Sequence, residues 1–339
     1  MVKKPPGQRG GIKELTFVHD TMPGFTRRRA GRGFCYYDTS GTRIVDSSVI
    51  TRLRKLAIPP AWTEVWICPD QSGRIQAVGW DARGRKQYRY HTRWREERDE
   101  EKFERLGAFG KNLPTIREAV DEELSARVVS RSRVLAGVIA LLDRTLMRVG
   151  NERYASENGA FGLTTLRNQH VSVTAQRISF SYRGKSGVRH RNVITDRRLA
   201  TLVRRCQELP GQTLFQWIDE EGTVHPIGSA DVNRYLRDIT GGPFTAKDFR
   251  TWGASSCVAG RLADASPPES DRALRLTVNE AIDCAAALLG NTRSVCRNSY
   301  VHPAVVEAFA DGRLARAGHK RSPVDGLLAP EECLLLDVL

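Results

Sequence analysis

The pattern of hydrophobic residues changes near residue 105, and this change constrains the fold more than any other feature of the sequence. Before it, short runs rich in β-branched and aromatic residues alternate with turn residues, as in EVWICPD and RIQAVGWD, which is typical of hairpin strands. After it, apolar residues recur over long stretches with helical spacing. The sequence therefore predicts an α+β protein of two domains, and 339 residues are enough to form two hydrophobic cores.

The same patterns predict the individual elements. In the first domain we expect strands at GFCYYD, TRIVD, EVWICPD and RIQAVGWD, and then one charged helix in TRWREERDEEKFERLGAFG. In the second domain we expect about three strands around residues 169–195, with helices elsewhere. The predicted helices are 114–128, 132–150, 196–208, 229–239, 245–262, 270–289, shorter ones near 292–301 and 303–313, and a last one in APEECLLLDVL. The expected divisions are a flexible basic arm (1–15), an N-terminal α+β domain (16–105), a second domain (106–320) and a C-terminal tail (321–339).

Basic residues are concentrated in the front of the chain. Lysine and arginine total 53 against 39 acidic residues, a net charge of +14. The first 105 residues hold 22 basic and 13 acidic residues, or +9, and the remainder carries +5. A surplus this concentrated indicates a polyanionic partner, and nucleic acid is the leading candidate.

Cysteine usage and hydropathy indicate the compartment. The seven cysteines are scattered without a CxxC pair, which favours reduced thiols in a cytoplasmic protein over a disulfide framework or a zinc site. The N-terminus MVKKPPGQRGG has no apolar signal core. The longest apolar run, CAAALL, is far too short to span a bilayer. We expect no membrane association.

Tyr300 lies in the segment GNTRSVCRNSYVHPAV, between two arginines and a His-Pro pair. Two interpretations are open. The ring packs on the core while the arginines face water, because buried tyrosines are common. Alternatively, Tyr300 is a nucleophile and the surrounding cations hold a phosphate.

Lys185 stands in SYRGKSGVRHR, in a glycine-flanked turn between two alternating strands. The string GKS is not a P-loop, because Ser179 occupies the position where a glycine would be needed. The chain has 43 arginines and only 10 lysines, so lysine is the less expected cation here. Because an ammonium group can release its proton and a guanidinium effectively cannot, Lys185 is a candidate general acid.

Three more polar residues each have an ordinary structural explanation. Arg148, in RVGNERY, is expected near the end of an apolar helix that stops at Gly150, where a cation complements the helix dipole. Arg250, in KDFRTWG, is expected on a helix and could pair with an acidic neighbour on the surface. Asn291 follows a long apolar helix, where asparagine is common.

Taken in order, these residues supply two arginines, a lysine, an amide donor and a tyrosine, a complete set for metal-free phosphoryl transfer. With them the chain resembles the type IB DNA topoisomerases of the compact bacterial and poxvirus-like kind. The resemblance rests on RVGNERY, the GKS turn, KDFRTWG, GNTRSVCRNSY and, in the first domain, IPPAWTEVWICPDQSGRIQAVGWDARGRKQYRYH. It covers roughly residues 15–320.

The resemblance implies a role for each residue. Tyr300 would attack a DNA phosphodiester and hold the cut strand as a 3′-phosphotyrosyl ester, expelling a 5′-hydroxyl. Arg148 and Arg250 would bind the non-bridging oxygens, Lys185 would protonate the leaving oxygen, and Asn291 would donate a hydrogen bond to the phosphate. Many relatives have histidine at this last position; asparagine keeps the hydrogen bond but has no proton to exchange. The ester conserves the energy of the broken bond, so relaxation of supercoils would need no ATP, metal or other cofactor.

The resemblance also implies an architecture. We expect a monomeric two-lobed DNA clamp with a small β-rich N-terminal domain. The catalytic domain would be mainly α-helical, of the tyrosine recombinase/topoisomerase IB type, with a three-stranded sheet, and would act on DNA in the bacterial nucleoid. The expected DNA contacts in the first domain are Gln87, Tyr88 and Tyr90 in GRKQYRYH. In the second domain they are Tyr154 at the end of the Arg148 motif, Arg167, and Arg293 and Arg297, which would share a helix face with Tyr300.

Two alternatives are weighed against this interpretation. A tyrosine site-specific recombinase shares the catalytic fold and the covalent chemistry, but recombinases normally carry an HxxR string where this chain has Lys247 in place of the histidine. Their front domain is also helical, not β-rich. A non-catalytic DNA-binding protein with a decayed site is the second alternative, and all five catalytic positions here are occupied by competent residue types.

Overall fold

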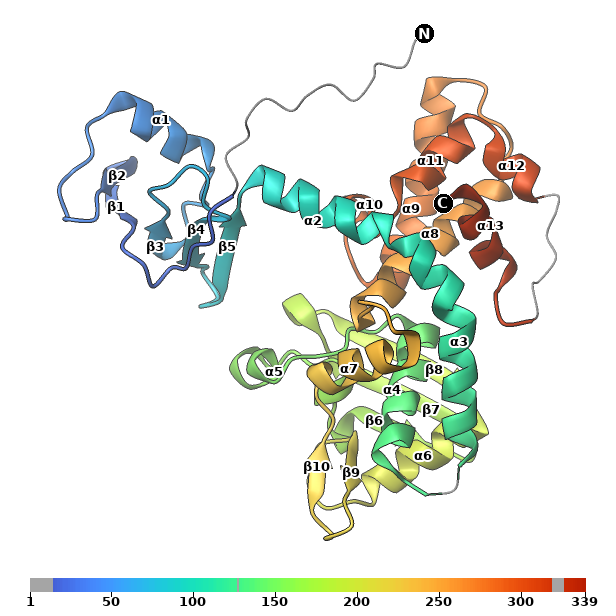
Figure 1. The fold of residues 1–339 in the computed structure, drawn as a ribbon. Helices are drawn as coiled ribbons and strands as arrows, with labels where there is room; N and C mark the ends of the chain where they lie inside the picture. The colour runs from blue at the N-terminus through green and yellow to red at the C-terminus, as the bar shows by residue number, and fades with distance from the viewer. Residues whose placement is uncertain (1–14, 127, 319–325) are drawn as a thin grey trace. The chain divides into compact units, whose positions relative to one another are not determined.

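The computed structural model describes residues 15–126, 128–318 and 326–339 (Figure 1). It divides into two compact units, with the division between Glu101 and Lys102 inside helix α2 (Thr92–Glu104). The expected N-terminal arm, except Leu15, and the first five residues of the expected tail lie outside the described residues.

The first unit is built on a five-stranded antiparallel sheet with the strand order β2-β1-β3-β4-β5. Leu53 of its helix α1 packs on the sheet with Val65, Ile67 and Ala77, forming a small core. The elements are β1 (Phe25–Ala30), β2 (Gly33–Tyr37), α1 (Ser47–Lys55), β3 (Thr63–Ile67), β4 (Ile75–Trp80) and β5 (Lys86–Tyr90).

The prediction of a strand at TRIVD, residues 42–46, is wrong. It is reduced to one bridge between Tyr37 and Arg43, and helix α1 follows directly. The Asp46 carboxylate accepts the backbone N–H groups of Ser48 and Val49, at 2.7 and 3.3 Å, and so fixes the start of α1. A single capping residue therefore outweighs the β propensity of the preceding run.

The charged helix expected over residues 92–110 is two helices, α2 and α3 (Leu106–Ser125), which meet at Arg105. The helix expected at 114–128 is part of α3 and begins eight residues earlier. Pro114 lies inside α3, and the buried face runs through it, from Leu106 and Phe109 to Leu124. Burial of this continuous stripe against the core stabilises the helix despite the hydrogen bond lost at proline.

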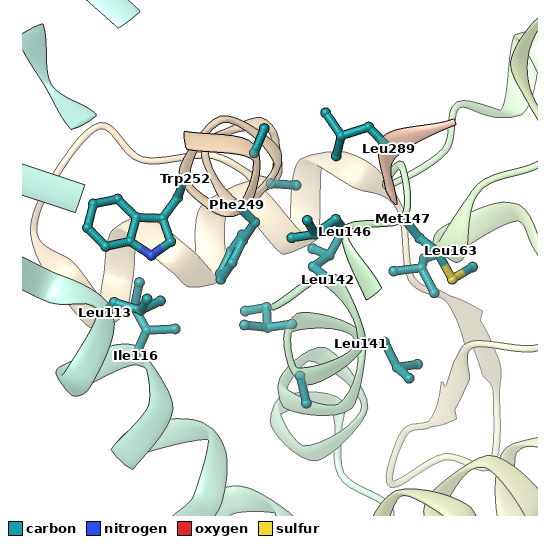
Figure 2. Close-up of a cluster of buried hydrophobic side chains, with 14 of the residues drawn as sticks. Leu113, Ile116, Leu141, Leu142, Leu146, Met147, Leu163, Phe249, Trp252 and Leu289 are labelled. Atoms are coloured by element: carbon teal, nitrogen blue, oxygen red, sulfur yellow. The ribbon is translucent and has the colours of Figure 1, made fainter. Parts of the chain in front are cut away.

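The second unit is mainly helical, and α8 is at its centre, in contact with α3, α4, α9 and α13 (Figure 1). In Figure 2, Phe249 and Trp252 of α8 face Leu113 and Ile116 of α3 across the core. The helices are α4 (Arg131–Thr145), α5 (Glu152–Asn158), α6 (Arg197–Gln207), α7 (Ser229–Thr240), α8 (Ala246–Ala263), α9 (Asp271–Leu289), α10 (Arg293–Ser299), α11 (Pro303–Ala310), α12 (Arg313–Gly318) and α13 (Pro330–Val338).

The predicted three-stranded island is confirmed as an antiparallel sheet, β6-β7-β8 (Val171–Val173, Arg177–Arg183 and Arg189–Thr195). Three short 3₁₀ turns, η1 (Leu163–Thr165), η2 (Asn168–His170) and η3 (Lys185–Gly187), precede the sheet or lie within it. Helix α5 and a two-stranded hairpin, β9 (Gln216–Ile218) and β10 (Val224–Pro226), were not expected from the sequence. Within the described residues, no helix is both long and apolar enough to cross a membrane.

Candidate active site

Arg148 does not lie on a helix, contrary to the sequence expectation. Helix α4 ends at Thr145 because Leu146 adopts a left-handed conformation (φ 53°, ψ 24°), and residues 146–150 continue as a non-helical segment. The backbone carbonyl of Arg148 accepts the N–H of Leu163 at 2.9 Å, and a Cβ on Gly162 would lie 2.6 Å from that oxygen. The close approach that glycine permits therefore sets the position of Arg148.

Arg250 is buried, with 4% of its surface exposed, and does not pair with a surface carboxylate. Its Nη1 donates to the carbonyl of Leu146, and its Nη2 donates to the carbonyl of Leu289 at 3.0 Å. Both carbonyls lie where a helix ends, α4 and α9 respectively, and a cation is favoured there by the helix dipole. One guanidinium thus joins the ends of two helices, while its buried Nε has no partner in the described structure.

Asn291 follows Gly290, which ends α9 in a left-handed backbone conformation (φ 61°). Its Oδ1 accepts a hydrogen bond of 2.6 Å from Nη2 of Arg148. A guanidinium can only donate hydrogen bonds, so the amide oxygen faces Arg148 and the amide nitrogen, Nδ2, faces away from it. The remaining donor, Nδ2, is buried and has no hydrogen-bond partner among the described residues.

Tyr300 follows α10 and is half-buried, with the guanidinium carbon of Arg250 5.1 Å from the centre of its ring. Burial acts to raise the pKa of Tyr300. The positive charges of Arg250, Arg148 and Lys247 outweigh burial, so the pKa lies below the usual value of 10. The cations that can bind a phosphate therefore also favour the phenolate.

Ser255 of α8 holds the backbone of the tyrosine segment. Its hydroxyl donates to the carbonyl of Tyr300 at 3.0 Å and accepts the N–H of His302 at 3.0 Å. Because Ser255 is fully buried and lies on the same helix as Arg250, α8 fixes both the tyrosine backbone and the arginine beside its ring.

Lys185 is exposed at the turn between β7 and β8, as predicted from the sequence. Ser186 and Gly187 both have positive φ (64° and 79°), which allows the tight turn. Lys185 lines one small pocket together with Arg148 and Arg250. The structure thus brings together four separate segments: Arg148 and Asn291 through a hydrogen bond, Arg250 beside Tyr300, and Lys185 at the pocket of the two arginines.

Sequence reasoning missed Tyr182 and His190, which line the same pocket. They are register partners on β7 and β8, and their rings stack at 5.3 Å. Burial lowers the pKa of His190, and the charges of Arg148 and Arg250 lower it further, so the neutral imidazole is favoured. The register of the predicted hairpin places His190 opposite Tyr182 and is the sequence signal that could have found them.

The expected DNA contacts of the first unit lie on β5. Tyr88 and Tyr90 share one face of the strand and stack at 5.9 Å, and Tyr90 is 40% exposed. Gln87 points to the other face, where its amide donates to Oδ2 of Asp81 at 3.0 Å. The two tyrosines therefore form one aromatic surface, in which Tyr90 is exposed and Tyr88 half-buried, and Gln87 does not belong to it.

The other expected contacts lie in the second unit. Tyr154 on α5 is 57% exposed, and the exposed Arg167 has its guanidinium 5.5 Å from the centre of the Phe161 ring. Arg293 forms an ion pair with Asp283 of α9, and Arg297 donates to Asn279 of the same helix at 2.8 Å. Both arginines thus have protein partners on α9.

Two known families and several individual proteins are similar to this chain. Residues 91–321 match the family "Eukaryotic DNA topoisomerase I, catalytic core", and residues 33–81 match "Bacterial DNA topoisomerase IB, N-terminal domain". The chain is 32% identical to DNA topoisomerase 1B of Acanthamoeba polyphaga mimivirus over 326 residues, covering 94% of this chain and 97% of the relative. It is 22% identical to DNA topoisomerase 1B of vaccinia virus (strain Copenhagen), covering 78% of this chain and 83% of the relative.

A third relative is DNA topoisomerase 1 of Schizosaccharomyces pombe, 26% identical over 63% of this chain and 25% of the relative. The aligned part is thus about a quarter of that longer protein. Both the catalytic core and the N-terminal domain match, and the mimivirus relative aligns over nearly its whole length. The chain therefore belongs to the type IB DNA topoisomerases.

Proposed function

We propose that this topoisomerase cuts one strand of duplex DNA by attack of the Tyr300 oxygen on a backbone phosphorus. The P–O5′ bond breaks, a 3′-phosphotyrosyl ester forms, and the 5′-hydroxyl leaves and later re-forms the diester. One observation carries the proposal: the ring of Tyr300 lies beside Arg250, while Arg148 holds Asn291 with its amide donor unpartnered. A buried donor without a partner is costly unless a ligand binds it.

Each residue has a distinct task in this proposal. The guanidinium groups of Arg148 and Arg250 and the amide of Asn291 bind the non-bridging oxygens, which gain negative charge in the pentacoordinate transition state. Lys185 donates a proton to the leaving 5′-oxygen. Lys185 is exposed on the turn between β7 and β8, so its side chain can extend toward a bound strand. The pKa of Tyr300, lowered by the neighbouring cations, favours attack near neutral pH.

We further propose that the division at residues 16–105 and 106–320 corresponds to two lobes that close around the DNA, and that the enzyme acts as a monomer on nucleoid DNA without ATP or metal. The surface of Tyr88 and Tyr90 suits contact with sugar and base edges. Tyr154 and Arg167 are exposed and suit contact with the backbone. Arg293 and Arg297 would have to exchange their partners on α9 for phosphates. Gln87 would have to leave Asp81 to reach a groove.

The test is relaxation of supercoiled plasmid in EDTA without ATP, with wild type beside Tyr300→Phe. We expect stepwise relaxation by the wild type only, equal DNA affinity for both proteins, and a denaturant-resistant protein–DNA adduct with the wild type only. An adduct with Tyr300→Phe would show that another residue is the nucleophile. Binding without relaxation by either protein would favour a recombinase or a decayed site, and strand exchange on paired sites would then distinguish these two.

A further inference from the structure

Lys102 is an unusual residue because it is a lysine with only 3% of its surface exposed. It lies in the last turn of α2, and its ammonium donates to the backbone carbonyl of Ser299 at 3.0 Å. Ser299 ends α10 and directly precedes Tyr300. Burying an ammonium is costly unless it is well paired, so the chain maintains this contact against a substantial desolvation penalty.

The next residue along the chain makes a second contact with the tyrosine segment. The ring of Phe103 meets the ring of His302 edge-on, with centres 5.0 Å apart. His302 is itself fixed, because its Nδ1 accepts the N–H of Ala304 and so caps α11. Lys102 therefore contacts Ser299, directly before Tyr300, and Phe103 contacts His302, two positions after it.

The junction between α2 and α3 is also anchored to the helix that carries Arg250. Arg105 donates from both Nε and Nη2 to one oxygen of Asp248, at 3.2 and 2.9 Å, and Asp248 is fully buried in the first turn of α8. Its other oxygen accepts from the N–H and hydroxyl of Thr245. This end of α2 and the start of α3 are thus held to α8 through Arg105, and to the residues flanking Tyr300 through Lys102 and Phe103.

From these contacts we infer that Lys102, supported by Phe103, is a positioning residue for cleavage and religation: it holds the backbone at Ser299 so that the Tyr300 oxygen stays in line with the phosphorus. The inference rests on the assignment of Tyr300 as the nucleophile. Lys102 touches no reacting atom in this scheme. It acts through the backbone carbonyl of Ser299, where a small displacement moves the phenol away from Arg250.

The magnitude follows from the geometric demand of the reaction. Misplacement of a reacting group by about 1 Å can reduce the rate on the order of 10²-fold. Because cleavage and religation pass through the same pentacoordinate state, Lys102→Met should slow both by roughly ten- to a hundredfold. Non-covalent DNA affinity should not change, because the buried ammonium is not available to phosphates.

The experiment is single-turnover cleavage of a labelled duplex carrying a cleavage site first mapped on plasmid DNA, with religation measured from the purified adduct. Lys102→Met is compared with wild type and with Lys111→Met, which removes an exposed lysine of α3. The rate constant and the final yield of adduct are read separately. A positioning role lowers the rate constant and leaves the yield unchanged, whereas a purely structural role lowers the yield of active enzyme and leaves the rate constant unchanged.

A duplex with sulfur in place of the leaving 5′-oxygen adds a second readout, because a thiolate leaves without being protonated. We expect this substrate to rescue Lys185→Met but not Lys102→Met. Lys102→Arg, which keeps a donor, should recover part of the rate. If Lys102→Met fails to fold, Phe103→Leu tests the same segment and should slow both steps in the same direction, to a smaller extent.

Wild-type rate constants for Lys102→Met, or for Phe103→Leu where the first variant does not fold, would overturn the inference. A defect confined to adduct yield, or one rescued by the sulfur substrate, would do the same. These outcomes are separate from failure of the proposed function, which would show as no adduct with the wild type or as an adduct with Tyr300→Phe.

Discussion

Asn291→Asp changes one atom of the cluster and should be among the most damaging substitutions of its size. The oxygen that accepts from Arg148 at 2.6 Å is retained. The unpartnered Nδ2 donor is replaced by a second oxygen, which has no hydrogen to give to a phosphate and carries negative charge. The side chain keeps its shape, so the fold and the position of Arg148 should be preserved.

The expected magnitude has two parts. Loss of one preorganised donor costs on the order of 10²–10³ in rate. A new negative charge about 4 Å from the phosphate costs about 4 kcal/mol at an effective dielectric constant near 20, equivalent to about 10³ in rate. Arg148 neutralises much of that charge, so we expect a total loss of about 10³–10⁴, against about 10²–10³ for Asn291→Ala, which loses only the donor.

The assay is the single-turnover rate of adduct formation at saturating enzyme, so that changes in affinity do not enter. Asn112→Asp, the same change in α3 outside the cluster, is the matched control and should cleave at the wild-type rate. Asn291→His, which restores a donor, should retain activity within about tenfold of wild type. If Asn291→Asp also cleaves within tenfold of wild type, the amide does not bind the phosphate and the reasoning fails.

Three further predictions follow from the same geometry. Lys185→Ala should cleave ordinary DNA roughly 10²–10⁴-fold more slowly but approach the wild-type rate on the 5′-sulfur substrate, and a persistent defect there would exclude a general-acid role. The pKa of Tyr300 lies below 10, so the cleavage rate should rise with pH and level off below pH 10. Lys247→Met should move this rise to higher pH because one cation near the phenol is lost. An unchanged pH–rate profile would contradict this account. Gly162→Ala should displace the carbonyl oxygen of Arg148, because the new Cβ would lie 2.6 Å from it. The cleavage rate should then fall on the order of 10²-fold with DNA affinity unchanged. A wild-type rate would show that the loop can adjust.

Much of the fold was predictable because its signals are local. The helices around residues 197–207, 229–240, 246–263 and 271–289 and the three-stranded sheet were confirmed to within one or two residues, since each carries a periodic apolar face bounded by capping or turn residues. The errors fall where a single contact outweighs periodicity. The left-handed conformation of Leu146 ends α4 five residues before the expected point, and Asp46 starts α1 after a run that reads as a strand.

The sequence by itself determined which residue types are present, their order, and hence the chemistry that the chain can support. Arg148, Lys185, Arg250, Asn291 and Tyr300 are predicted as catalytic residues from their motifs alone. Only the tertiary structure decided which groups these side chains contact. The buried Arg250 binds carbonyls at the ends of two helices, and Arg148 orients the amide of Asn291. Ser255 and Lys102 hold the backbone around Tyr300. These contacts join residues up to 197 positions apart, and no local pattern specifies which distant carbonyl a buried cation will bind. That choice is made when the core packs, because each buried polar group must then find a partner among the groups that packing brings within reach.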